Sequence, residues 1–362
     1  MIIKIEPLDT LFFRDGKPFN MDDDTWADAV FPPFPSVIYG ALRSAYFSNH
    51  IDELEKANHN DDPTKGLKIK AIYYEIGNDI YLHLPADCVK EKDNINNPTQ
   101  VAVLSMTKNK NTNSSLTDCI LSYKNDIKVE NVSNGLVRKS MFKKYLIQNA
   151  IEKFYIKKIS DYVLPEPKIG IGIDKKTGTS EEGKLYRADM RRLSNEENDK
   201  VSIIVDFEGL NLPEEGLMKL GGEGKAASYK KYNEEVLIDF PVAVGTMFKL
   251  YLSTPAIFEK GWIPEWIDED TLIGNYKEIE VKLLTTAIGK PIHIGGFDMK
   301  NRKPKPMYKA VPAGSVYYFE LQKGTMEDVK KTFYQTAISD IYPEQGFGIT
   351  YVGKISKGGE VL

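Results

Sequence analysis

The sequence is poor in the residue types that build disulfide frameworks and metal centres. Its 362 residues include two cysteines, Cys88 and Cys119, which lack CxxC spacing, and only four histidines. Disulfide scaffolds and cysteine zinc sites require more thiols at closer spacing. Both cysteines are therefore expected to be plain thiols, and the protein is expected to hold no metal and no cofactor.

Long hydrophobic runs are also absent. No stretch of 18 apolar residues occurs, and the segment Met1 to Lys4 does not open a secretory signal peptide. With 41% hydrophobic and 28% charged residues, the composition is that of an ordinary folded protein. We expect a cytoplasmic protein without membrane contact.

Recognisable catalytic motifs are missing from the chain. It has no HExxH, no GxSxG and no acidic cluster on a regular element that would hold two metal ions. The run Leu220 to Lys225 is not a P-loop, because its spacer is too short and Ala226 stands where a hydroxyl residue is needed. It is not an acidic cyclase motif either, since Gly224 and Lys225 replace the required carboxylates.

One acid–base set can nevertheless be posed. His293 with Tyr308 or Lys305 has the chemistry for metal-independent RNA cleavage, which needs a proton donor and acceptor near a 2′-hydroxyl. A histidine that contacts RNA or supports the structure is the simpler interpretation. We therefore do not expect an enzyme.

Charge is segregated along the chain although the net charge is only −4. Seven Lys or Arg against one acid occur from Arg138 to Lys158, and six against one from Lys290 to Lys309. Acidic residues gather elsewhere, at 22–24 and 268–270. This pattern suits one face that binds a polyanion and another that meets protein partners, the alternative being two solvated basic faces.

Two linked runs near the N-terminus carry the strongest local signals. In EPLDTLFFRDGKPF, an apolar step delivers Arg14 and Lys17 to a tight turn. In FPPFPSVIYGALRSA, prolines precede Ser36, the candidate N-cap of a helix that contains Arg43. The N–H groups at the start of such a helix could hold an anion, so these four residues are candidate phosphate contacts.

The hydrophobic pattern predicts two α+β units. A strand at 2–5, a helix from 36, a hairpin of strands 70–74 and 80–84, and a basic helix at 138–158 fit a βαββαβ ferredoxin-like unit, of the kind that RNA-recognition modules use. The second set comprises strands at 201–207, 246–252, 315–321 and 347–352, a hairpin within 281–294, and helices at 214–220 and 326–336.

A basic arm is expected between the two units. The block from Ile169 to Arg192 alternates isoleucine with glycine and then carries cations around a tyrosine. Glycines let the backbone approach phosphate, basic side chains supply charge, and Tyr186 offers a stacking surface for a base. We expect RNA contacts there, the alternative being an exposed hairpin kept soluble by its charges; the residues are Lys175, Lys176, Lys184, Tyr186, Arg187, Arg191 and Arg192.

Two further glycine-containing segments are candidates. In the first, a glycine turn would let Lys225 reach a phosphate, although a purely structural turn fits equally well. In the second, prolines stiffen a cationic loop after a strand, and the RNA-side residues would be His293, Gly295, Gly296, Arg302, Lys303 and Lys305. The C-terminal Gly346-Phe347-Gly348 is expected to serve close backbone packing.

These blocks resemble a known family. The linked N-terminal runs, together with IGIDKKTGTSEEGKLYRADMRRL, LGGEGKAASY and GFGITYVGKI in that order, are similar to the Cmr-complex subunits that bind the 5′ handle of CRISPR RNA (crRNA). That family belongs to the RAMP superfamily and works in type III-B effectors. The resemblance implies two ferredoxin-like (RRM-like) RAMP units with inserted loops, at 1–165 and 201–362, and a basic β-hairpin "thumb" at 166–200.

The resemblance also implies a function. We expect a non-catalytic subunit of an antiviral ribonucleoprotein that grips the crRNA handle and docks a large polymerase/cyclase-like subunit. It would abut a backbone RAMP subunit and meet target RNA only indirectly. Two alternatives stay open: a metal-independent endoribonuclease that processes CRISPR RNA, and a protein-only scaffold whose basic patches bind acidic partners.

Overall fold

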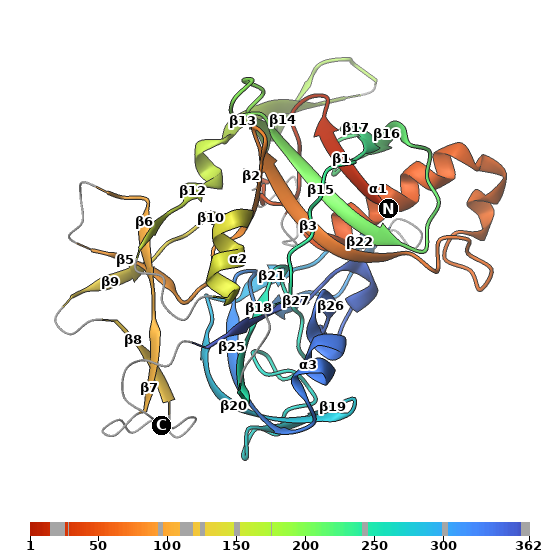
Figure 1. Cartoon of the computed structure of the whole chain (residues 1–362). Coiled ribbons are helices and arrows are strands. Elements are labelled where there is room, and N and C mark those ends of the chain that lie inside the picture. Colours follow the sequence, from red (N-terminus) through yellow and green to blue (C-terminus); the bar gives the residue numbers. More distant parts are fainter. Residues whose placement is uncertain are drawn as a thin grey trace.

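The chain folds around two antiparallel sheets, which lie one above the other in Figure 1. The computed structural model describes residues 1–14, 26–27, 29–92, 97–108, 119–123, 127–147, 153–174, 176–240, 245–298 and 303–355. In this described part, no helix is both long enough and apolar enough to span a membrane.

The first sheet contains a ferredoxin-like core. Its eight strands are, in spatial order, β12 (Lys157–Lys158), β10 (Gly135–Arg138), β4 (Asp79–His83), β3 (Lys68–Ile76), β15 (Val201–Glu208), β1 (Ile2–Pro7), β17 (Ala226–Lys231) and β16 (Glu215–Lys219). Four of them follow along the chain as β1, β3, β15 and β17 but lie side by side as β17-β1-β15-β3. This is the strand order 4-1-3-2 of a ferredoxin-like unit.

The second sheet repeats this arrangement. Its six strands are, in spatial order, β19 (Ile273–Tyr276), β20 (Ile279–Ala287), β25 (Val316–Lys323), β18 (Met247–Leu252), β27 (Ile349–Lys354) and β26 (Thr336–Ala337). The four core strands β18, β20, β25 and β27 lie as β27-β18-β25-β20, again in the order 4-1-3-2. The predicted fold class, two ferredoxin-like RAMP units, is confirmed.

Each unit keeps only one of the two helices of the full motif. In the first unit, α1 (Pro35–Asn49) connects β1 to β3, and strand β16 stands where the second helix would be. In the second unit, α3 (Met326–Phe333) connects β25 to β27, and an irregular segment follows β18 in place of the first helix. The two units are therefore related in topology but differ in what covers their sheets.

Helix α1 begins one residue earlier than the sequence predicted. Pro35 occupies its first turn, Phe34 is the N-cap, and no side chain caps the helix. Ser36 is therefore not the N-cap, because proline, which has no N–H to satisfy, takes the first helical position instead. The apolar residues Ile38, Ala41, Leu42 and Ala45 are buried at helical spacing against the first sheet.

A long two-stranded hairpin projects from the first unit at the top of Figure 1. Its strands β13 (Val163–Ile173) and β14 (Ser180–Leu193) pair antiparallel, and β2 (Trp26–Ala27) adds to β14 in parallel. The expected hairpin arm is present, and it begins before residue 166 because its base is anchored at Val163, opposite Leu193.

Smaller strand pairs complete the fold. They are the four-stranded sheet β11 (Phe154–Tyr155), β6 (Gln100–Val103), β5 (Cys88–Glu91) and β9 (Val129–Asn131), and the pairs β7 (Ser105–Lys108) with β8 (Cys119–Ser122), β21 (Ile292–Ile294) with β24 (Tyr308–Ala310), and β22 (Phe297–Asp298) with β23 (Lys303–Pro304). Three short 3₁₀ turns lie at Ile51–Lys56, Ile159–Asp161 and Pro343–Gln345.

The sequence predicted most core strands correctly and erred on several inserted or edge elements. The basic helix, α2, covers only Lys139–Ile147, and residues 154–155 and 157–158 are strands that pair elsewhere. The predicted helix at 214–220 is the edge strand β16, whose Gly216 lies opposite Tyr229 of β17. The predicted hairpin within 281–294 is wrong, since β20 pairs with β25 and β21 with β24.

The two sheets also divide the chain at a later point than residue 200. Strands β15, β16 and β17, which we had placed in the C-terminal unit, belong to the first sheet. Ferredoxin-like topology explains this, because the third and fourth core strands must return to flank the first. Residues 77–200 are thus an insertion between the second and third core strands of the first unit.

The units are joined by an apolar cluster with one buried carboxylate at its centre. Helix α2 contributes Phe142 and Tyr145, which pack with Tyr251 and Tyr351 of the second sheet. Asp87, fully buried between β4 and β5, accepts hydrogen bonds from the hydroxyls of Tyr145 (2.7 and 2.9 Å) and of Tyr318 in β25 (2.6 Å).

A buried cation completes this junction. The Lys249 ammonium of β18 lies 3.9 Å from the Asp87 carboxylate and 3.3 Å from the centre of the Tyr145 ring. Desolvation lowers the pKa of Lys249, and the Asp87 charge opposes that shift. Because Asp87 belongs to the first unit and Lys249 and Tyr318 to the second, the network fixes one unit against the other.

We predict that Asp87→Ala lowers the free energy of unfolding by about 3–5 kcal/mol, because it leaves Lys249 buried without its counter-charge. Urea unfolding measures this change. Glu197→Ala, at an exposed position, is the matched control and should change stability by less than about 0.5 kcal/mol. A loss below about 1 kcal/mol for Asp87→Ala would contradict the role assigned to the network.

Candidate nucleic-acid interface

Three sequence blocks that are far apart in the chain meet beside the hairpin arm. Leu11 exchanges two main-chain hydrogen bonds with Arg191 of β14, at 2.7 and 2.8 Å. The next residue, Phe12, accepts a hydrogen bond of 2.8 Å from the N–H of Gly222. The N-terminal run, the hairpin arm and the glycine turn at 220–225 therefore form one surface.

Glycine is required at the turn by close approach of the backbone. Gly221 has φ +83°, and a Cβ built on it would lie 2.6 Å from the carbonyl oxygen of Phe12. A side chain there would push the turn away from the N-terminal run. The glycines thus position the turn, and Lys225 stands at its end, with its ammonium 3.0 Å from the Asp9 carboxylate.

We call the basic residues of this surface the cationic seam: Arg14, Arg187, Arg191, Arg192 and Lys225. Arg14 is exposed and pairs through its backbone with Ala29, while Arg187 lies on β14 opposite Ile169. The glycine turn brings Lys225 next to Arg192, since both cations contact Asp9 at 3.0 Å. All five described residues were predicted as RNA contacts, and the structure gathers them around the hairpin base in two groups, with Arg187 and Arg191 on one face of β14 and Arg192, beside Lys225, on the other.

Carboxylates balance part of the charge of the seam. Arg191 pairs with Asp189 at 2.5 Å, and Arg192 pairs with Glu166 as well as with Asp9. Hydrogen bonds from Lys225, the Thr10 backbone and Arg192 lower the pKa of Asp9 to about 2. The acids hold the basic side chains in place, and they lower the positive potential that an RNA backbone would meet.

The hairpin arm extends the surface outward. Ile169, Ile171 and Ile173 of β13 are all more than half exposed, and they alternate with Gly170 and Gly172. Lys176 lies exposed in the turn at the tip. Lys175 falls outside the described residues, as do the side chains of Lys184 and Tyr186, so their RNA contacts stay predictions, as does that of Lys176.

A cavity of about 760 Å³ lies in the cleft between the two units. Its walls include Phe31 and Phe34 of the proline-rich run, Pro85 and Pro312, with His293 and Lys290 also in the lining. The N-terminal run that carries Arg14 packs against the cavity wall, because Val30 donates a hydrogen bond of 2.8 Å to the carbonyl of Phe13 and the rings of Phe13 and Phe31 are 6.2 Å apart.

A neutral histidine lies in the wall of the cavity. The His83 Nε2 atom is 3.3 Å from the Tyr74 hydroxyl, and its ring packs edge-on against that tyrosine at 5.4 Å. Desolvation lowers the pKa of His83 to about 4. At neutral pH this part of the cavity wall therefore presents an uncharged, aromatic surface that suits a nucleobase better than a phosphate.

The second basic segment lies apart from the seam. His293 is exposed on β21 opposite Lys309, whereas Tyr308 lies opposite Ile294. Directly opposed residues of an antiparallel pair share a face, so His293 and Tyr308 point to opposite faces and do not form an acid–base set.

The glycines of that segment mark the start of its small hairpin. The carbonyl of Gly296 accepts a hydrogen bond of 2.9 Å from the N–H of Lys305, and Gly295 precedes it at the end of β21. Lys303 and Lys305 are exposed, and Arg302 lies outside the described residues. RNA contact by this segment remains a prediction.

Arg43 has a structural role that sequence reasoning missed. Its guanidinium donates to Asp62 (2.6 Å), Thr64 (2.7 Å) and Asn58 (3.0 Å) in the loop after α1. The predicted phosphate contact is not supported by this geometry, since three partners already use its donors. The polar loop at 52–65 gave no sequence signal of this pairing.

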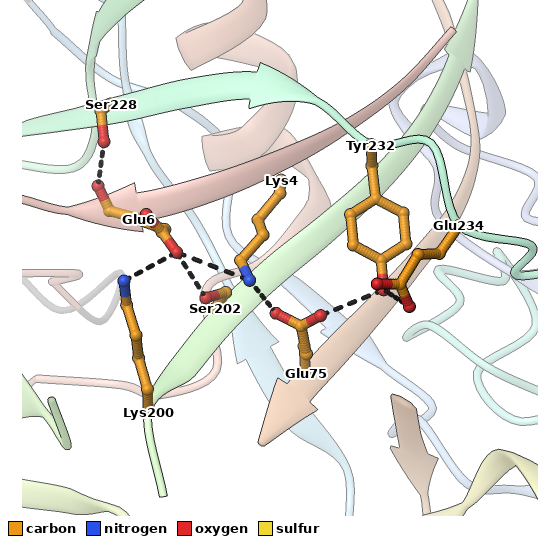
Figure 2. A network of polar contacts seen from close by, with 8 residues as sticks. All are labelled: Lys4, Glu6, Glu75, Lys200, Ser202, Ser228, Tyr232 and Glu234. Atoms are coloured by element: carbon orange, nitrogen blue, oxygen red, sulfur yellow. Dashed lines mark hydrogen bonds and ion pairs between the residues drawn. The ribbon is translucent and has the colours of Figure 1, made fainter. Parts of the chain in front are cut away.

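The sheet face that RNA-recognition modules use is closed in the first unit. Figure 2 shows Lys4 of β1 between Glu6 and Glu75, with Tyr232 donating to Glu75 at 3.0 Å. Lys200 adds a second cation on Glu6 at 2.9 Å (Figure 2). Glu75 and Tyr232 are buried, so this face offers ion pairs in place of exposed aromatic rings.

Metal chemistry finds no support in this part of the molecule. Among the described residues, no group of three or more His, Cys, Asp or Glu side chains is arranged to hold a metal ion. In the Figure 2 network, the carboxylates are instead neutralised by the two lysines.

We predict that Asp9→Asn strengthens the binding of single-stranded RNA by roughly three- to tenfold, because it releases Arg192 and Lys225 from their shared counter-charge. Fluorescence anisotropy at constant salt measures this, with Asp161→Asn as an exposed control. The ion pairs of Asp9 are fully formed at pH values above about 4, the pKa of Asp9 in the unfolded chain, and they weaken as the pH falls towards its folded pKa of about 2, so the titration is done near neutral pH. Unchanged or weaker RNA binding would contradict the balancing role of Asp9.

We also predict that stability falls by about 2 kcal/mol between pH 7 and pH 5 through His83. The unfolded chain binds a proton at His83 below pH 6.5, whereas the folded protein resists doing so until about pH 4, so protonation favours unfolding. His83→Gln should flatten this dependence in urea unfolding. An equally steep dependence in the variant would assign the effect to other groups.

The comparisons with known proteins agree with this architecture. The family model of the CRISPR-associated protein (Cas_Cmr3) matches residues 3–355. The fold is similar to a chain in a cryo-EM structure of the type III-B Cmr-beta complex bound to cognate target RNA and AMPPnP. That match has a TM-score of 0.52 and 18% identity, and covers 88% of this chain and 86% of the other.

Two other solved structures match less closely. A chain of Cmr-beta bound to cognate target RNA has a TM-score of 0.49 and 16% identity, with 92% and 94% of the two chains covered. A chain of the type III-A Csm3–Csm4 subcomplex has a TM-score of 0.37 and 16% identity, with 88% and 92% covered. No curated protein matches the sequence.

The family match is independent of the local geometry and spans almost the whole chain, including the N-terminal runs, the hairpin arm and both glycine-rich blocks. The family resemblance that these blocks predicted is confirmed. The chain belongs to the CRISPR-associated Cas_Cmr3 family of Cmr-complex subunits.

Proposed function

We propose that the protein is a non-catalytic subunit of a type III-B CRISPR ribonucleoprotein that binds the 5′ repeat-derived handle of crRNA. The observation that carries this proposal is the meeting of three family blocks in the cationic seam, whose N-terminal run packs against the wall of the central cavity. A strand of RNA needs both a cationic track for its backbone and apolar recesses for its splayed bases.

In this proposal the seam binds the RNA backbone and the cavity binds a base. Arg187 and Arg191, four residues apart on β14, share one face of the strand and suit successive phosphates, with Arg14 beside them. Arg192 and Lys225 meet at Asp9 on the other face and would hold a further stretch of the backbone where it turns round the edge of the hairpin. The cavity, walled by Phe31, Phe34 and prolines, takes a base that has left the stack. The handle is then held by its backbone and fixed in register by one or more bases.

The same arrangement accounts for the partners. The exposed hairpin arm reaches away from both sheets and, in this proposal, crosses the guide where target pairing begins (Figure 1). The large polymerase/cyclase-like subunit and the first backbone RAMP subunit would dock on surfaces outside the seam. Target RNA would be met only through its pairing with the guide.

The proposal includes no cleavage step. The acid–base set posed from the sequence is split between two faces of the β21–β24 pair, with His293 on one and Tyr308 on the other. The enzyme alternative would therefore have to pair His293 with Lys305 or use other residues. His293 fits better as a polar residue at the rim of the cavity.

The test is an anisotropy titration of the purified chain, alone and with the large subunit, against crRNA and against the same RNA lacking its 5′ handle. We predict that Arg187→Ala and Lys225→Ala each weaken handle-dependent binding roughly fivefold and reduce the salt slope by about 0.7 per lost phosphate contact. Lys331→Ala, an exposed cation on α3, is the matched control and should change neither quantity.

Each alternative gives a different outcome. Cleaved RNA on a gel of the bound fraction would support the endoribonuclease. Binding without handle dependence, in both formats, would leave the protein-only scaffold. Equal losses for Lys331→Ala and the seam variants would mean that the seam is not the binding surface.

A further inference from the structure

A second pocket lies in the C-terminal unit, far from the hairpin arm. It has a volume of about 440 Å³ and is lined by Glu265, Trp266, Tyr276, Ile338, Ser339 and Asp340. We call it the aromatic–acidic pocket. Its strand β19 and the nearby helix α3 lie at the bottom of Figure 1, whereas the tip of β13 and β14 lies at the top.

Two aromatic rings form one side of this pocket. The centres of the Trp266 and Tyr276 rings are 5.0 Å apart, and Tyr276 stacks on the buried ring of Phe333 at 5.6 Å with an angle of 6° between planes. Packing against Phe333 holds both rings in a fixed orientation. Rigid, partly exposed aromatic faces bind cations through the negative charge of their π systems.

Carboxylates form the other side. The Oδ2 atom of Asp340 accepts hydrogen bonds from the N–H groups of Glu259 (3.0 Å) and Glu265 (3.1 Å), which fix it at the pocket. Burial raises the pKa of Asp340, and a cation beside its carboxylate would lower that pKa again. Glu265 is exposed at the rim, and the acidic run 268–270 follows close by in the chain.

One donor in the pocket lining has no acceptor. The Nε1 atom of Trp266 is buried and makes no hydrogen bond to any residue in the described part of the chain. Buried indole N–H groups are normally paired, because an unpaired one costs about 1–3 kcal/mol. This N–H is closed off from the pocket space, so the feature that calls for a ligand is the negative charge beside the two rings.

We propose that the aromatic–acidic pocket binds an arginine side chain of a neighbouring protein subunit, which stacks on the Trp266 and Tyr276 rings and pairs with the carboxylates of Asp340 and Glu265. Arginine fits better than lysine because its planar guanidinium stacks on aromatic rings and pairs with carboxylates at the same time. RNA does not fit, since the pocket has the charge of RNA itself. The proposal rests on the function proposed above, that the protein works inside a multisubunit complex.

The pocket also has cations of its own, which the proposal must accommodate. The Lys260 ammonium donates its hydrogen bonds to the carbonyls of Glu265 (3.1 Å) and Ile267 (3.0 Å), and not to Asp340. The Lys277 ammonium lies 5.5 Å from the centre of the Tyr276 ring. It shows that this ring accepts a cation, and it is the group that an incoming arginine would meet.

The first test uses a pair of small probes. N-acetyl-arginine methylamide is titrated into the full-length protein while the indole N–H signals of Trp266 and Trp262 are followed by NMR, with Trp266→Phe to assign them. The neutral isostere, N-acetyl-citrulline methylamide, is the matched probe. We expect the Trp266 signal to shift with the arginine probe and at least fivefold weaker binding of the citrulline probe. No shift, or equal binding of both probes, would overturn the proposal.

The second test uses the assembled complex. Asp340→Asn and Glu265→Gln keep the size and acceptor oxygens of the pocket but remove its charge, and together they should weaken incorporation of the protein into the reconstituted complex at least fivefold. Handle-RNA binding is measured on the same samples. Weakened assembly with unchanged RNA binding supports the proposal, and unchanged assembly overturns it. If the wild-type protein binds RNA with and without the 5′ handle equally well, that result would instead contradict the proposed function.

Discussion

The fold depends on one buried carboxylate. Asp87 belongs to the first unit, yet two of its principal partners, Tyr318 and Lys249, belong to the second, so neither unit can move without breaking a charged contact in a dry environment. The central cavity lies between the same two units and is lined in part by the segment that ends at Cys88. Its shape is therefore set by the Asp87 network.

Main-chain contacts between three segments form the frame of the binding surface, and basic side chains lie on that frame. Leu11, Phe12 and Gly222 bring the N-terminal run, β14 and the glycine turn together through backbone hydrogen bonds, and glycine at 221 leaves room for that close approach. Cations are placed on this frame and held by acids such as Asp9 and Asp189. Such a surface is preorganised but only moderately positive, which suits a protein that must select one RNA segment and not coat nucleic acid in general.

Sequence reasoning recovered the elements whose pattern is local. The core strands alternate or form apolar runs, and the hairpin arm carries its own turn and charges, so both were predicted. The end of α2 was missed because the apolar spacing after Ile147 still resembles a helix. The strand β16 was predicted as a helix, and only its pairing with β17 in the sheet makes it a strand. The bonds of Arg43 to the 58–64 loop and the closure of the sheet face by Lys4 and Glu75 depend on tertiary contacts that no local pattern reveals.

The proposed function requires that the N-terminal run, the hairpin arm and the glycine turn contact the same RNA. The most direct measurement is photo-crosslinking of crRNA that carries 4-thiouridine in its 5′ handle to the complex, followed by mass spectrometry of the crosslinked peptides. We predict crosslinks in peptides that cover residues 11–14, 187–192 and 220–225. Crosslinks confined to the helix α3 side, or an absence of handle crosslinks while the rest of the guide reacts, would contradict it.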